Sequence, residues 1–297
     1  MKTKNLPKRK WRTLKKCLNW SKRMRELFET VLILSLLGFF LALLLLCLKP
    51  LTAKRFPAKW QYYVWITVLI VMIVPGYKLI PDKEVEKIQQ FTHIEAPQTD
   101  VSSENEFQSE AYDTPPITEF KINVSPALTV SIFDILSLVW LGGMIIYLVT
   151  VIISYFLYLL RKRKNSVSKG ECDELAYVKE MLGIRRRIRV RASYDTASPM
   201  LVGVFFPVIY IPLKEIPSDM LKLVFLHELT HYKRKDLIVK WFALFVNGVH
   251  WFNPLSYIIS ANLSEACEVS CDMEVTKNMD EEEQKLYMKT ILALVEK

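Results

Sequence analysis

Residues 31–48 read VLILSLLGFFLALLLLCL and contain no charged side chain. An α-helix rises 1.5 Å per residue, so roughly 20 apolar residues cross the ~30 Å hydrocarbon core of a bilayer. Residues 60–77 and 135–160 form two further uncharged runs of this kind. Aromatic residues lie near the ends of the second run, as expected at a membrane interface: Trp60, Tyr62, Tyr63, Trp65 and Tyr77. These runs predict three membrane-spanning helices, over about 31–48, 60–80 and 133–160.

The composition of the 297-residue chain supports a membrane protein. Hydrophobic residues make up 51% of the chain and the mean hydropathy is +0.17, which excludes a disordered polypeptide. Only 8 glycines are present, which excludes a collagen-like repeat. The net charge of +9 suits contact with anionic lipid better than nucleic acid binding in so apolar a chain. The odd number of cysteines, 5, argues against a disulfide framework.

Charges between the apolar runs predict the orientation of the spans. Residues 49–59 contain four basic residues and no acid, whereas 81–130 contain ten acidic and three basic residues. Because basic loops stay in the cytoplasm, 49–59 and everything after residue 160 are expected inside, and the acidic loop 81–130 outside. The basic N-terminal segment 1–30 would then lie outside, against the rule. Either a start of translation at Met24 or dominance of the later charges resolves this conflict.

Residues 161–297 are expected to form a globular cytoplasmic domain. The alternating sequence RRIRVRAS at 186–193 predicts a strand, and MLVGVFFPVIYIP at 200–212 predicts two short strands broken near Gly203 and Pro207. Ser218 is expected to cap a helix that runs through residue 231. These patterns predict a mainly helical domain with a small β-sheet.

The stretch 241–264 is uncharged but contains asparagines, serines and a histidine, which makes it polar for a span. We therefore expect two helices broken at Asn253-Pro254 that lie against the membrane or partly within it, rather than a fourth span. Further helices are expected to begin near Leu263 and Glu281.

Residues 227–231 read HELTH and carry the strongest chemical signal. His227 and His231 are four residues apart, so both imidazoles lie on one face of a helix and can reach one ion. Glu228 follows the first histidine, where a carboxylate can take a proton from the water that attacks a peptide carbonyl; zinc lowers the pKa of such a water to about 7. The motif predicts a zinc site with Glu228 as the catalytic base, although so short a pattern also occurs by chance.

A catalytic zinc needs a third protein ligand and one open position. Residues 262–274 (NLSEACEVSCDME) are helical in pattern and offer several candidates. Glu268 and Asp272 are four residues apart and share a face, so we predict Glu268 as the ligand and Asp272 as the carboxylate that orients a histidine ring from behind. Glu265 competes with Glu268 for the role of ligand.

Three other candidates leave alternatives open. Asp236, five residues after His231, either orients a ligand or caps the next helix. Cys267 and Cys271 would give a closed, structural zinc site, and we expect them to be packing residues instead. His250, in an aromatic stretch, is expected to be a packed histidine, with stabilisation of an oxyanion as the alternative.

Taken together, the motifs resemble the BlaR/MecR family of integral-membrane zinc metallopeptidases that act as antirepressors. The resemblance rests on HELTH, Lys235-Asp236, Trp251-Phe252-Asn253-Pro254, Glu268 and Cys271-Asp272, and it covers nearly the whole chain. It implies one zinc per chain, held by His227, His231 and Glu268, with Glu228 as the general base. It also implies a cytoplasmic active site and proteolytic signalling that ends in the loss of a DNA-bound repressor.

Antibiotic-sensing members of that family continue into a further span and an extracellular penicillin-binding domain, which this sequence does not include. A Ser-x-x-Lys string at 166–169 lies in the basic linker after the third run and lacks its usual partner motifs, so we treat it as accidental. We therefore do not expect β-lactam sensing in the chain.

The sequence thus predicts an α+β membrane protein: three N-terminal transmembrane helices in 31–160, then a zincin-like peptidase domain in 161–297 with a membrane-associated segment at 241–264. The expected activity is hydrolysis of a cytoplasmic or membrane-proximal protein, with a transcriptional repressor as the candidate substrate. A membrane quality-control protease and a non-catalytic or truncated signal transducer are the alternatives. The bilayer is an expected partner, and direct nucleic acid binding is not expected, because the arginines at 185–191 can meet lipid head groups instead.

Overall fold

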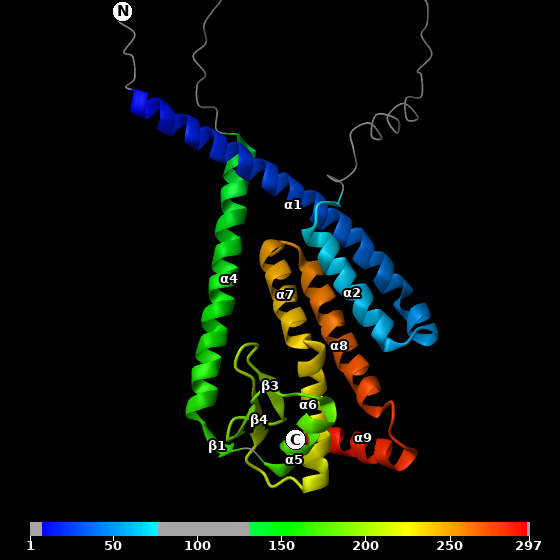
Figure 1. Cartoon of the computed structure of the whole chain (residues 1–297). Helices are drawn as coiled ribbons and strands as arrows, with labels where there is room; N and C mark the ends of the chain where they lie inside the picture. The colour runs from blue at the N-terminus through cyan, green and yellow to red at the C-terminus, as the bar shows by residue number, and fades with distance from the viewer. Residues whose placement is uncertain (1–7, 77–130, 171, 296–297) are drawn as a thin grey trace, which may run out of the picture.

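The computed structural model describes residues 8–76, 131–170 and 172–295. Helices alone form one end of the molecule, and a small sheet with further helices forms the other (Figure 1). The helices of the first end, called the long helices below although α7 has only 14 residues, are α1 (Lys8–Arg55), α2 (Ala58–Ile73), α4 (Ile132–Lys164), α7 (Asp236–Val249) and α8 (Pro254–Thr276). The other elements are β1 (Ser166–Gly170), α5 (Asp173–Leu182), β2 (Arg189–Ser193), β3 (Met200–Val202), β4 (Val208–Pro212), α6 (Ser218–Arg234) and α9 (Glu281–Val295).

Two of the three expected spans are long and apolar enough to cross a bilayer. They are Asn19–Thr52, within α1, and Ile132–Lys164, which is α4. The span expected over 60–80 corresponds to α2, which has only 16 residues and extends about 24 Å. It ends at Ile73 because Pro75 follows, and Val74, the residue before the proline, takes an extended conformation. Residues 77–80 of the expected span lie outside the described part of the chain.

Helix α2 has one buried face and one exposed face, which includes Tyr63 and Ile70. Its buried face, which includes Trp65, Leu69 and Met72, packs against α1 and α8. Near the start of the candidate span in α1, Arg25 forms an ion pair of 2.7 Å with Asp134 in the first turn of α4. The start of the candidate span in α1 and the start of α4 therefore lie close together.

The stretch 241–264 forms two antiparallel helices with a break at the predicted place. Helix α7 ends at Val249, and the Asn253 side chain accepts a hydrogen bond from the Leu255 amide at the start of α8. The turn lies between α4 and α1: Trp140 of α4 donates to the Val249 carbonyl at 2.8 Å, and Asn253 donates to Ser35 of α1 at 2.9 Å.

The prediction of a new helix near Leu263 is wrong. Helix α8 continues without a break from Pro254 to Thr276, because neither glycine nor proline interrupts it and its buried face continues through Leu263, Ala266 and Cys267. The helix that begins at Glu281 is confirmed as α9.

The small sheet has the strand order β1-β2-β4-β3, with β2 and β4 parallel and the other pairs antiparallel. The two strands predicted in 200–212 are confirmed as β3 and β4. The strand predicted at 186–193 is β2, which starts only at Arg189, where pairing with Val208 begins. Residues 166–170, interpreted as part of a linker, form the edge strand β1, so the Ser-x-x-Lys string has no place in a catalytic site.

Helix α6 packs on this sheet through Leu221, Phe225 and Leu229, which join apolar side chains of α5, β2 and β4 in one core. The prediction that Ser218 caps this helix is wrong, because Pro217 is the N-cap residue. Ser218 is the first helical residue, and its hydroxyl donates instead to Glu174 of α5 at 2.8 Å. Helix α6 thus lies between the sheet on one side and α8 and α9 on the other.

Candidate metal centre

The HELTH segment lies in the second half of α6, and its two histidines point to one place. The Nε2 atoms of His227 and His231 are 3.1 Å apart. Glu268 of α8 joins them, with its Oε2 atom 3.2 Å from Nε2 of His231 and 3.7 Å from Nε2 of His227. The predicted set of three ligand-type residues is therefore brought together from two helices.

The spacing of these three atoms fits a tetrahedral zinc ion. Zn–N distances of 2.0–2.1 Å place neighbouring ligand atoms about 3.3 Å apart at the corners of a tetrahedron. The three observed separations lie close to that value. A cavity of about 390 Å³ borders the same three side chains together with Glu228 and strand β3, which leaves room for a fourth, non-protein ligand.

The other ring nitrogen of each histidine is held by a carboxylate. Nδ1 of His227 lies 3.1 Å from Asp272, and Nδ1 of His231 lies 2.7 Å from Asp236. Because each Nδ1–H can donate to its carboxylate, each Nε2 keeps its lone pair for a metal. Asp236 is the buried first residue of α7 and Lys235 is the N-cap, so its contact with His231 is the one that an orienting role requires.

Two tyrosines that no sequence motif placed at the site complete these pairs; Tyr62, expected at a membrane interface, is buried beside Asp236. Tyr287 of α9 donates to Asp272 at 2.6 Å and lies 2.7 Å from Nδ1 of His227. Tyr62 of α2 donates to Asp236 at 2.8 Å. No sequence spacing signals these contacts, because the partners are 15 and 174 positions apart along the chain.

Charges in the site favour a bound cation. Burial lowers the pKa of His227, but hydrogen bonds with Asp272 and Glu268 outweigh burial and raise that pKa to about 10. Burial also lowers the pKa of His231, but the hydrogen bond with Asp236 outweighs burial and raises that pKa above its usual range. Burial raises the pKa of Glu268, but bonds to the two histidines outweigh burial and lower it. The acidic neighbours thus favour positive charge at the two rings, which a metal ion at the Nε2 atoms would supply.

Glu228 faces the same cavity but does not join the three converging atoms. Its Oε2 accepts a hydrogen bond of 2.7 Å from the Leu201 amide on β3. Burial raises the pKa of this carboxyl above its usual range. A raised pKa brings a carboxylate closer to the value that suits general acid–base catalysis near neutral pH.

The other candidates lie elsewhere. Glu265 points away from the histidines and pairs with Lys49 of α1 at 2.8 Å. His250 is buried and its Nε2 lies 3.0 Å from the Met72 carbonyl, so the alternative of an oxyanion role is wrong. Lys240, which the sequence analysis did not mention, forms an ion pair of 2.9 Å with the second oxygen of Glu268.

Both cysteines of α8 are buried behind the histidines. Two sets of donor atoms lie within 4.8 Å of one another: His227, His231 and Cys271, and His231, Asp236 and Cys267. However, Cys271 donates to the His227 carbonyl at 3.7 Å, and Cys267 lies 4.0 Å from Nδ1 of His231, on the ring edge already bonded to Asp236. The set with Glu268 uses the free Nε2 atoms and borders the cavity, so it fits a catalytic ion better.

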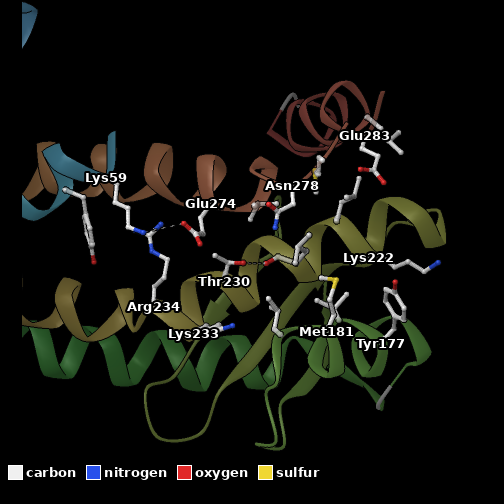
Figure 2. A pocket seen from close by; sticks show the side chains of 18 of the residues that line it. Lys59, Tyr177, Met181, Lys222, Thr230, Lys233, Arg234, Glu274, Asn278 and Glu283 are labelled. Carbon is white, nitrogen blue, oxygen red and sulfur yellow. Dashed lines mark hydrogen bonds and ion pairs between the residues drawn. The ribbon is translucent and has the colours of Figure 1, made fainter. Parts of the chain in front are cut away.

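A larger cavity of about 870 Å³ lies on a different face of α6, between α2, α5, α8 and α9 (Figure 2). Thr230 and Arg234 line it from α6, and Lys59 of α2 pairs there with Glu274 of α8 at 3.5 Å. None of its lining residues is His227, Glu228 or His231. The HELTH chemistry therefore faces the smaller cavity.

A helix with two histidines and a buried glutamate, completed by a glutamate from a later helix, has the make-up of a metallopeptidase site. The profile of the BlaR1 peptidase M56 family matches residues 29–297, and the chain belongs to that family. The BlaR/MecR resemblance seen in the sequence is thereby confirmed.

Curated relatives include two proteins named as regulatory and one named for methicillin resistance. The chain is 26% identical over 265 residues to "Regulatory protein BlaR1" of Bacillus licheniformis, covering 86% of this chain and 43% of that protein. It is 24% identical over 282 residues to "Methicillin resistance mecR1 protein" of Staphylococcus aureus (strain Mu50 / ATCC 700699), covering 90% of this chain and 46% of that protein. BlaR1 of Staphylococcus aureus is 26% identical over 274 residues, covering 88% and 45%. The chain spans less than half the length of these relatives.

Proposed function

We propose that the chain is a membrane-embedded zinc endopeptidase that acts in regulatory signalling. The observation that carries the proposal is the convergence of His227, His231 and Glu268, at tetrahedral spacing, beside a buried Glu228. These three residues would hold one zinc ion, and zinc, when bound, supplies a Lewis acid that activates water and polarises a carbonyl. The names of the relatives and the membership of a peptidase family support the regulatory and proteolytic parts.

The chain's own residues have separate tasks in this proposal. Glu228 takes the proton of the attacking water and passes it to the leaving amine, and the Leu201 amide holds its carboxylate in place. Asp272 and Asp236 fix the ring orientation of the two histidines. An extended peptide can lie beside β3, the edge strand that borders the cavity.

The substrate class follows from the position of the site. We propose that residues 161–297 face the cytoplasm and that the α7–α8 pair enters the membrane beside α1 and α4. The substrate is then a cytoplasmic or membrane-proximal protein, and a transcriptional repressor is the candidate that fits the regulatory names of the relatives.

Two variants of the purified full-length chain test the proposal. Wild type should hold about one zinc by elemental analysis, His227→Ala should lose it, and Glu228→Gln should keep it while cleavage of a peptide library stops. The glutamine keeps an oxygen for the Leu201 amide, so the fold around β3 is preserved. Equal metal loss in both variants would contradict the role of Glu228 as a base that is not a ligand. Full cleavage by Glu228→Gln would contradict the peptidase mechanism.

A further inference from the structure

The connection between β3 and β4 presents two adjacent phenylalanines to the surroundings. Phe205 and Phe206 each have 75% of their surface exposed. Gly203 allows the tight turn that precedes them: its φ is +94°, and a Cβ there would lie 2.5 Å from the Phe206 carbonyl oxygen. Exposed aromatic pairs of this kind mark contact surfaces rather than ordinary solvent-facing loops.

Arginines surround the same turn. Because β2 pairs with β4 from Arg189 and Val208 onward, the loop before β2 lies beside the turn. The Arg186 guanidinium donates to the Phe205 carbonyl. A pocket of about 360 Å³ is lined by three arginines, the two phenylalanines and one proline: Arg186, Arg187, Arg189, Phe205, Phe206 and Pro207. No carboxylate within the described residues pairs with these three guanidiniums, so the pocket suits an anion.

The phenylalanines also border a second, apolar cavity of about 520 Å³. Tyr155 and Leu159 of α4 form one wall, and Ile238 and Trp241 of α7 form another. The rings of Tyr155 and Trp241 meet edge to face at 4.8 Å. An anion pocket and an apolar cavity are therefore joined through a shared pair of aromatic rings.

The hairpin lies at the end of a candidate span. The Tyr158 hydroxyl of α4 contacts Met200 of β3 at 2.8 Å, and Lys162 donates to the Asp195 carbonyl at 2.9 Å. Figure 1 shows β3 and β4 between the lower end of α4 and α6. The last turn of α4 is wholly basic, Arg161 to Lys164, as expected where a span meets lipid head groups.

We propose that the β3–β4 hairpin binds an anionic phospholipid from the leaflet that meets this end of α4. The phosphate lies among the three arginines, and an acyl chain passes over Phe205 and Phe206 into the apolar cavity. Nucleic acid carries phosphates but no aliphatic chain, so it would leave the apolar half unfilled. Because β3 also carries the Leu201 amide that holds Glu228, the lipid anchors the strand beside the candidate metal centre. The lipid site itself does not depend on peptidase activity.

Photocrosslinking of the full-length chain in nanodiscs tests this proposal. Phe206 is replaced by p-benzoyl-phenylalanine, and the nanodiscs contain equal amounts of phosphatidylglycerol and phosphatidylcholine. Mass spectrometry then gives the ratio of the two lipids in the adduct. Each guanidinium near an anionic surface contributes roughly fivefold in affinity, so we expect phosphatidylglycerol to be enriched about tenfold or more over the bulk ratio.

The double substitution Arg186→Ala and Arg187→Ala should reduce the enrichment to about fivefold or less, the contribution of Arg189 alone. The control, Lys214→Ala with Lys289→Ala, removes two positive charges from exposed positions outside both cavities. It should leave the enrichment unchanged. Absence of any lipid adduct from the folded protein, or equal yields of both lipids in the starting protein, would overturn the proposal. Enrichment that is abolished by inorganic phosphate would assign the pocket to a soluble anion and would overturn the lipid site as well.

Discussion

Glu265 and Glu268 lie less than one turn apart on α8 but face different partners. Glu268 reaches the two histidines, whereas Glu265 reaches Lys49 on α1. The four-residue spacing predicted that Glu268 and Asp272 share one face of the helix, and the structure places both carboxylates beside the histidines. The spacing could not reveal that Lys240 binds the second oxygen of Glu268, since that contact depends on how α7 packs on α8.

The first prediction compares these two glutamates. Glu268→Gln should weaken zinc binding at least about 100-fold, because loss of a charged ligand exceeds the 10–100-fold cost of losing an outer hydrogen bond. Glu265→Gln should leave zinc affinity unchanged, since it removes only a surface ion pair. Competition with a chelator measures both affinities. The reverse order would place the ligand one turn away and remove the role of Asp272.

The second prediction concerns the buried thiols. Cys267→Ala and Cys271→Ala should each retain about one zinc per chain, because the Nε2 atoms point to Glu268 and not to either sulfur. A small loss in the midpoint of thermal unfolding is expected for each, since both side chains are fully packed. Elemental analysis checks the zinc content. Loss of zinc from one variant alone would show that its thiolate belongs to the ligand set.

At the scale of elements, short-range patterns were predicted more reliably than the lengths of helices. The alternation of apolar residues and the turn residues act locally, and they were sufficient to predict β3, β4 and the break at Asn253. They were not sufficient to predict the ends of α2 and α8. Helix α2 ends before a proline although the apolar run continues past it. Helix α8 keeps one continuous buried face, so it continues where the sequence changes from uncharged to charged residues. Tertiary packing decides such boundaries.

The third prediction tests the crossing of α4 with the α7–α8 turn. A Cβ at Gly143 would lie 2.4 Å from the Trp251 indole, whereas a Cβ at Gly142 meets no atom within 4 Å. Gly143→Ala should therefore destabilise the protein by about 1–3 kcal/mol, the usual cost of overpacking. Gly142→Ala should be neutral or stabilising by up to about 1 kcal/mol, because alanine favours a helix. Thermal unfolding in one detergent gives the comparison, and equal effects would show that this contact does not fix the crossing.

At the scale of the whole molecule, the long helices and the candidate metal centre form one packed unit. A single core contains Ala42 of α1 and Trp65 of α2 together with Val246 of α7 and Ile259 of α8. Helix α8 carries Glu268, and α2 carries the tyrosine that holds Asp236. Movement of the long helices can thus reach the ligand-type residues directly, without a mobile linker.

The last prediction measures this connection with two adjacent tyrosines of α2. Tyr62 is buried and donates to Asp236, which in turn holds His231. Tyr63 is 56% exposed and makes no such contact among the described residues. Tyr62→Phe should weaken zinc binding about tenfold, at the lower end of the effect of outer partners, because it acts through one intervening carboxylate. It should also shift the absorption bands of the cobalt-substituted protein, which report ligand geometry and which a general loss of stability would not shift. Tyr63→Phe should change neither quantity. If both variants bind zinc as the wild type does, α2 does not set the position of His231, and a signal from the long helices has to reach the centre through α8 instead.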